Sequence, residues 1–136
     1  MLIKASDLTN ELKLDIDSHK FSSWLRLFEF RYNFLKEHHK LIVFAGFVDR
    51  TKKGFHIYLK TTVLDFSSVL FLESLFGSDL NKQMYGYAEW HDILFRNKFN
   101  GQSVEKFDKK RTQELNKVIR KINKRKRFVK VYKVKV

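Results

Sequence analysis

Apolar residues change their spacing several times along this chain, and the order of those changes restricts the fold more than any other feature. Residues 13–17 and 55–63 alternate apolar and polar side chains, which is typical of β-strands with one buried face. Residues 19–39 instead place apolar side chains at steps of three and four, which predicts an amphipathic helix. Its stripe consists of Phe21, Trp24, Leu25, Phe28, Tyr32 and Leu35.

The middle of the chain predicts a hairpin followed by a helix. Residues 41–48 are a continuous apolar run, which favours a strand buried on both faces. Residues 49–54 form the turn, where Gly54 can adopt a left-handed conformation. Strand 55–63 then directs Phe55, Ile57 and Leu59 to the core and His56, Tyr58 and Lys60 to the other face. A second helix is predicted over 66–76.

The remaining segments complete a β-α-β-β-α-β order. Ser78 is expected to cap a short helix over 79–85, and residues 86–95 predict a strand. A basic helix over 103–123 and a β-segment over 127–136 end the chain. This order predicts an α+β fold with an RRM-like, split βαβ sheet, which carries its helices on one face and leaves the other open. We expect an RRM-like domain over 1–103, with the basic helix and strand of 104–136 packed on it.

The positive charge is concentrated at the C-terminus. The chain has a net charge of +13, and residues 108–136 alone hold 13 Lys and Arg against two acids. Such a segment attracts polyanions, so nucleic acid is the expected partner. The residues expected to contact it are Lys60, Arg111, Arg120, Lys121, Lys124, Arg125, Lys126 and Arg127.

Several classes of protein are excluded by composition. The chain has no Cys, which excludes disulfides and thiolate chemistry. No apolar run approaches the roughly 18–20 residues needed to span a bilayer, and the N-terminus lacks the apolar stretch of a signal peptide. We therefore expect a cytoplasmic protein without a membrane partner.

Polar residues of the open sheet face suggest phosphate chemistry. Asp15 and Asp17 project from one face of their strand, and His56 is expected on the neighbouring strand of the same face. Paired carboxylates suit Mg²⁺ or Mn²⁺, and a nearby His or Lys can donate to phosphate oxygens. Asp79 or Asp92 is the candidate for a third acid, with Asp79 preferred.

The same residues carry a resemblance to a known family. The segment LKLDID (12–17), followed by TKKGFHIYL (51–59), resembles the catalytic palm of the archaeo-eukaryotic primase superfamily in a minimal form. The resemblance implies a metal-dependent nucleotidyltransferase of a replication system, in which Asp15 and Asp17 bind metal and His56 contacts the incoming nucleoside triphosphate. Residues 75–98 also resemble a block in small proteins of archaeal viruses and plasmids.

Two other functions stay open at this point. One is a non-catalytic DNA- or RNA-binding module, because residues 53–60 partly imitate the RNP1 strand of RNA-binding domains. That reading requires Phe55 on the open face. The other is a replication-initiator nuclease, a class that needs a His-x-His pair and a nucleophilic Tyr; only one His is present in FHIYL (55–59).

Overall fold

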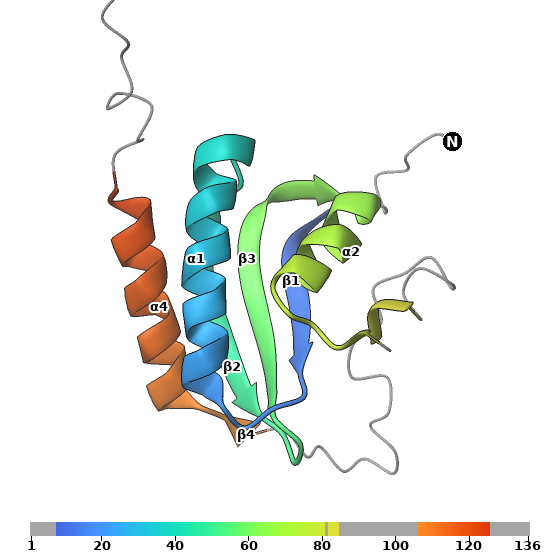
Figure 1. Cartoon of the computed structure of the whole chain (residues 1–136), viewed down its shortest axis with the longest axis vertical. Helices are drawn as coiled ribbons and strands as arrows, with labels where there is room; N and C mark the ends of the chain where they lie inside the picture. The colour runs from blue at the N-terminus through green and yellow to red at the C-terminus, as the bar shows by residue number, and fades with distance from the viewer. Residues whose placement is uncertain (1–7, 81, 85–105, 126–136) are drawn as a thin grey trace, which may run out of the picture.

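The computed structural model describes residues 8–80, 82–84 and 106–125 (Figure 1). In chain order, the elements are β1 (Leu8–Ile16), α1 (Phe21–His39), β2 (Val43–Arg50), β3 (Phe55–Asp65), α2 (Phe66–Leu75), β4 (Lys106–Phe107) and α4 (Lys109–Asn123). Within the described residues, the strands form one antiparallel sheet in the order β1-β3-β2-β4. The predicted α+β fold is therefore confirmed.

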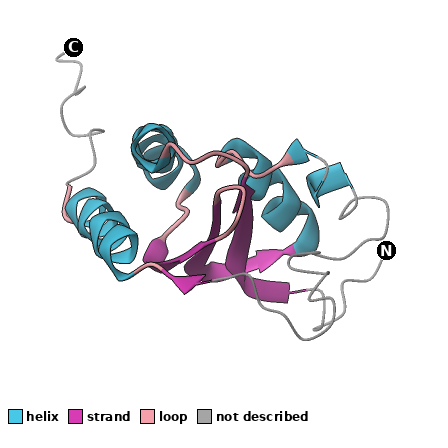
Figure 2. Cartoon of the chain, turned by 90° about the horizontal axis from the view of Figure 1, so that it is seen from below, coloured by secondary structure: helices cyan, strands magenta, loops and turns pink. Residues whose placement is uncertain are grey.

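The sheet contains the predicted split βαβ unit. β3 is antiparallel to both β1 and β2, so the latter two run parallel with β3 between them. α1 connects β1 to β2, and α1 and α2 lie on one side of the sheet (Figure 2). α4 lies beside α1 next to β2 (Figure 1). The strands predicted over 86–95 and 127–136 lie outside the described residues.

The core confirms the predicted stripe of α1. Phe21, Trp24, Phe28, Tyr32 and Leu35 are buried, and Leu25 is partly buried. Ring centroids of the successive pairs from Phe21 to Tyr32 lie 5.3–5.6 Å apart. Apolar side chains of all three long strands and of α4 pack against these rings; among them are Leu14, Val48, Ile57 and Ile119.

The prediction that residues 41–48 are buried on both faces is wrong. Val43 and Val48 are buried, whereas the side chains of Phe44 and Phe47 are 60% and 44% exposed. The described helices lie on one side of the sheet, so the alternate residues of β2 point away from the core that they cover. An unbroken apolar run identified the strand but could not show which of its faces is covered.

Gly54 is needed for a different reason from the one predicted. Among the described glycines only Gly77 has a positive φ, so Gly54 is not left-handed. A Cβ on Gly54 would lie 2.0 Å from the backbone oxygen of Ile16 and 2.7 Å from the backbone nitrogen of Ser18. The hairpin turn therefore packs directly on the end of β1, and only glycine leaves room for that approach.

Side chains from the helices satisfy the outer edge of β2. Asn116 of α4 accepts a hydrogen bond from the Gly46 N–H at 2.9 Å and donates one to the Gly46 carbonyl at 2.8 Å. Thr112 Oγ1 accepts from the Val48 N–H at 2.9 Å, and Tyr32 Oη accepts from the Val43 N–H at 2.8 Å. The edge of β2 is thus closed by polar side chains, and among the described residues only the short β4 pairs with it there as a strand.

The helix predicted over 103–123 begins later, at Lys109. The Asp108 carboxylate accepts a hydrogen bond from the Arg111 N–H at 3.1 Å, so Asp108 is its N-cap. The two residues before the cap, Lys106 and Phe107, pair with Arg50 and Asp49 as β4. The start of the helix is therefore set by the cap and by this strand contact.

Candidate functional site

The face of the sheet opposite the helices carries a grid of aligned side chains. Residues paired across an antiparallel ladder point to the same side of the sheet. One row is Asp15, His56 and Asp49; the next is Lys13, Tyr58 and Phe47; the third is Glu11, Lys60 and Ala45. The expected placement of Asp15, His56, Tyr58 and Lys60 on this face is confirmed by the register, whereas Asp17 follows the end of β1 at Ile16 and is not placed by strand pairing.

His56 lies between two carboxylates in its row. Its Nε2 is 3.5 Å from Asp15 Oδ1, and Asp49 is its partner on the other strand. The pKa of His56 is lowered to about 4, chiefly by burial and to a smaller extent by the charge of Lys82, although the charge of Asp49 acts in the opposite direction. His56 is therefore a neutral imidazole at neutral pH, able to donate one hydrogen bond and accept another.

Asp15 interacts electrostatically with the other acids of this region. Burial raises its pKa, and the negative charges of Asp79 and Asp17 raise it further, while Lys82 and Lys53 act in the opposite direction. Asp15 is therefore close enough to Asp17 and to Asp79 for their charges to repel its own. Asp92, the other candidate for a third acid, lies outside the described residues.

The segment that follows α2 brings Asp79 to Asp15. The Asp79 N–H donates to the Asp15 carbonyl at 2.7 Å, and Ser78 Oγ accepts from the Asp15 N–H at 3.0 Å. Ser78 is therefore not the helix cap that the sequence suggested. That position belongs to Asp79, whose carboxylate accepts from the Lys82 N–H at 3.2 Å and caps the helical residues that follow.

A buried ion pair holds this segment against β1. Glu73 is fully buried, and its Oε1 lies 3.0 Å from Nζ of the buried Lys82. Glu73 Oε2 also accepts from the Lys13 N–H at 2.7 Å, and Lys82 Nζ donates to the Lys13 carbonyl at 2.8 Å. The outward N–H and C=O groups of Lys13 and Asp15 all have partners, so no strand can pair with β1 at these residues.

Three residues of this region were missed by the sequence analysis: Glu73, Lys82 and Asp49. Glu73 is the one charged residue of α2, and a charged residue in such a helix is a signal of a buried partner. Asp49 could have been found by extending the hairpin register from His56 across the turn. Lys82 carries no comparable local signal, because its partners are nine and 69 residues away.

Within the described ranges, no three His, Asp or Glu side chains form a group that could hold a metal ion. Mg²⁺ is often held by only one or two carboxylates, its remaining ligands being water and substrate phosphates. Asp15 together with Asp17 or Asp79 offers that smaller donor set. The described acids therefore fit a metal that arrives with a nucleotide better than one held by protein alone.

The predicted nucleic-acid contacts fall into three groups. Lys60 pairs with Glu11 on the open sheet face, and Arg111 lies 3.6 Å from the Asp108 carboxylate. Lys121 and Arg125 approach Glu29 of α1 at 3.3 and 3.5 Å, whereas Arg120 and Lys124 are exposed on α4. Lys126 and Arg127 lie outside the described residues.

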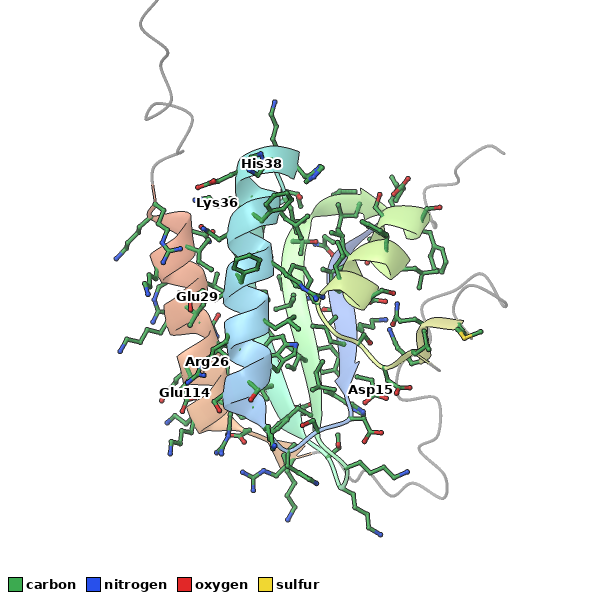
Figure 3. The ribbon with its side chains drawn as sticks, viewed as in Figure 1. Asp15, Arg26, Glu29, Lys36, His38 and Glu114 are labelled. Carbon is green, nitrogen blue, oxygen red and sulfur yellow. The ribbon has the colours of Figure 1, made fainter. Side chains whose placement is uncertain are left out.

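The cationic helix and the acidic residues lie at opposite edges of the sheet. Figure 3 shows Asp15 on β1 and Glu114 on α4, with α1 between them. Seven of the ten exposed side chains of α4 and of the residue pair after it are basic: Lys109, Lys110, Lys117, Arg120, Lys121, Lys124 and Arg125. Glu114 is the single acid between 109 and 125. Among the described residues, the cationic surface of α4 is thus separate from the acidic residues beside β1.

The alternative based on the RNP1 strand fails at a specific residue. Phe55 is 3% exposed and packs against Phe21 with ring centroids 5.3 Å apart, on the helix-covered side of β3. It cannot stack on a base at the open face.

No described helix has both the length and the hydropathy required to span a bilayer.

Comparison of the chain with models of known protein families, with curated proteins and with solved structures gives no significant match.

Proposed function

We propose that this protein binds nucleic acid, and that the outer face of α4 supplies most of the electrostatic attraction. The observation that carries the proposal is the run of seven exposed Lys and Arg between 109 and 125, against one Glu. The opposite face of the same helix buries Leu115, Ile119 and Ile122 in the core. The cations are therefore fixed on a rigid, packed element rather than on a loose tail.

A packed basic helix is suited to a phosphate backbone for two reasons. Its side chains extend in a fixed direction, so several can contact successive phosphates together. Each neutralised phosphate releases counterions, so affinity falls as the salt concentration rises. In a plot of log affinity against log salt, each contact adds about −0.9 to the slope on duplex DNA and about −0.7 on single strands. Only Lys121 and Arg125 of the seven have a described acidic partner, the shared Glu29.

The test compares two charge-neutralising pairs by fluorescence anisotropy of labelled oligonucleotides at several salt concentrations. Lys117→Gln/Arg120→Gln removes two exposed charges from α4, and Lys20→Gln/Lys52→Gln removes two exposed charges from the ends of the sheet. We expect the α4 pair to weaken binding and to reduce the salt slope by about 2. Equal effects of the two pairs would show that only net charge matters.

A second candidate function is metal-dependent nucleotidyl transfer at the acidic residues of the open face. It is favoured by the raised pKa of Asp15, because acids that repel one another are what a divalent cation stabilises. Asp15 with Asp17 or Asp79 would hold Mg²⁺ or Mn²⁺, which would supply charge stabilisation during phosphoryl transfer. The neutral imidazole of His56 would donate to a phosphate oxygen of a nucleoside triphosphate.

Incorporation of labelled nucleotides on primed and unprimed templates with Mn²⁺ tests the second candidate. We expect activity in the wild type and in the surface control Glu114→Gln, and none in Asp15→Asn/Asp17→Asn. Absence of incorporation by the wild type, with template binding intact, would leave the protein as a binding module of a replication system without catalysis.

A further inference from the structure

The outward surface of α1 carries four exposed residues in one line. Arg26, Phe30, Phe34 and His38 are each separated by four positions, so they follow one side of the helix. Phe30 is 77% exposed and Phe34 is 52% exposed, and the Phe34 and His38 rings lie 4.5 Å apart. We call this line the aromatic stripe. It lies away from the buried stripe of the same helix.

A hollow borders the aromatic stripe on the side of α4. It has a volume of about 280 Å³ and is lined by Arg26, Glu29, Phe30 and Asn33 of α1 and by Arg125, which follows α4. Figure 3 shows Arg26, Glu29 and Lys36 on the side of α1 nearest α4. The most exposed Phe of the described residues, Phe30, therefore lies beside two arginines, at the boundary with the cationic helix.

The two helices that form this hollow are firmly joined. Tyr32 Oη donates to Asn123 Oδ1 at 2.6 Å, and Lys36 Nζ donates to the Ile122 carbonyl at 2.7 Å. Glu29 binds both Lys121 and Arg125 from the other side. The rings and the cations are therefore held in a fixed relation to each other, which reduces the entropy lost when a ligand binds.

The charges around the hollow favour an anionic ligand. Arg26 and Arg125 line it, and the one acid in its wall, Glu29, is already engaged by Arg125 and by Lys121. An exposed aromatic ring among cations matches a base next to a phosphate: the π-face of the base stacks on the ring, and the phosphate contacts the cations. A purely apolar partner would explain the rings but not the cations.

We propose that the aromatic stripe and the hollow bind single-stranded nucleic acid, with bases stacked on Phe30 and Phe34 and the backbone held by Arg26, Arg125 and the cations of α4. This inference rests on the proposed nucleic-acid binding and adds the form of the ligand. A single strand is required because its bases expose their faces, whereas in a duplex the faces are covered by neighbouring base pairs.

The experiment measures the affinity of the full chain for a labelled single-stranded oligonucleotide and for a duplex of equal length, in wild type and two variants. Phe30→Ala/Phe34→Ala removes the rings, and Phe71→Ala removes an equally apolar ring on α2 that is 58% exposed. We expect the double variant to lose about tenfold to a hundredfold in single-strand affinity. The affinity for the duplex should change by less than twofold. The salt slope should be unchanged, because no charge is lost.

A third variant, Phe30→Trp, reports stacking directly. We expect its added indole fluorescence to be quenched when the single strand binds, relative to the wild type with its two Trp. Unaltered single-strand affinity in Phe30→Ala/Phe34→Ala, or a fluorescent Trp at position 30 that is not quenched, would overturn the inference while leaving the α4 proposal intact. Absence of any nucleic-acid binding by the wild type would overturn both.

Self-association is measured in the same samples by sedimentation. A wild-type dimer that dissociates in Phe30→Ala/Phe34→Ala, with single-strand binding unchanged, would show that the stripe is covered by a second copy of the chain, against the proposal. A monomer in every variant, with the expected loss of single-strand affinity, supports it. Equal thermal stability of wild type and double variant confirms that the exposed rings do not hold the fold.

Discussion

Asn116→Ala tests whether α4 replaces a strand at the edge of β2. In the wild type, the Asn116 amide pairs with both the N–H and the C=O of Gly46, at 2.9 and 2.8 Å. The same amide also donates to the Thr112 carbonyl at 2.8 Å. A Cβ on Gly46 would lie 2.5 Å from Leu115 Cδ2, so α4 packs directly on this part of the strand. The variant leaves two backbone groups without partners beneath the helix.

Each backbone group left unpaired costs about 1–3 kcal/mol when it is buried. Both groups are only partly buried, so water replaces some of the lost bonding, and Ala is favoured over Asn within a helix by roughly half a kcal/mol. We expect a net loss of about 2–3 kcal/mol, out of the roughly 5–15 kcal/mol typical of a single domain. For a chain of this size the melting temperature should fall by about 10 °C.

Urea denaturation and thermal melting measure this loss, with Gln113→Ala as the matched control. Gln113 is exposed on the same helix, and its replacement should change stability by no more than about 0.5 kcal/mol. Asn116→Ala within about 0.5 kcal/mol of that control would refute the reasoning. Such a result would mean that the burial of Leu115 and Ile119, with the Thr112–Val48 hydrogen bond, is sufficient to attach α4 to the sheet.

Three further predictions concern the residues that shape the open face. Gly54→Ala should lower stability by about 3 kcal/mol in urea denaturation, because its Cβ would collide with the Ile16 carbonyl and a backbone atom cannot rotate away. Burial lowers the pKa of folded His56 to about 4, so wild type should lose about 2 kcal/mol between pH 6.5 and 4, and His56→Gln should lose less. Stability curves over that pH range check this, and parallel curves for the two proteins would contradict it. The raised pKa of Asp15 means that its charge disfavours folding, so Asp15→Asn should raise the melting temperature at pH 7 and less so at pH 4. An equal or lower melting temperature at pH 7 would contradict that repulsion.

The elements could be predicted because their signals are local. Alternation in 55–63 and three- and four-residue steps in 19–39 depend only on which face of a strand or helix is buried. The same alternation placed Asp15, His56 and Lys60 on the open face before any contact was known, and the register confirms it. The burial of 41–48 was misjudged, because an apolar run does not show how many faces of a sheet are covered.

The partners of these residues could not be predicted from their own neighbourhood. Asp49 lies beside His56 because the two residues are paired in the register of β2 and β3. Asp79 lies beside Asp15 because their backbones share a hydrogen bond, although they are 64 positions apart. The four-residue spacing of Arg26, Phe30 and Phe34 was visible in the sequence, but its meaning depends on α4, whose contact with α1 joins positions about 90 residues apart.

Sequence by itself therefore determined the type of every described element except β4, the faces that the side chains of α1 and β3 occupy, and the concentration of positive charge in 108–136. Tertiary structure alone decided which faces meet. It closed the β2 edge with Asn116, placed Asp79 beside Asp15, and set the rings of α1 against the cations of α4. The physical reason is that periodicity shows which side of one helix or strand a residue faces. A site also requires two or more helices or strands to be positioned relative to one another.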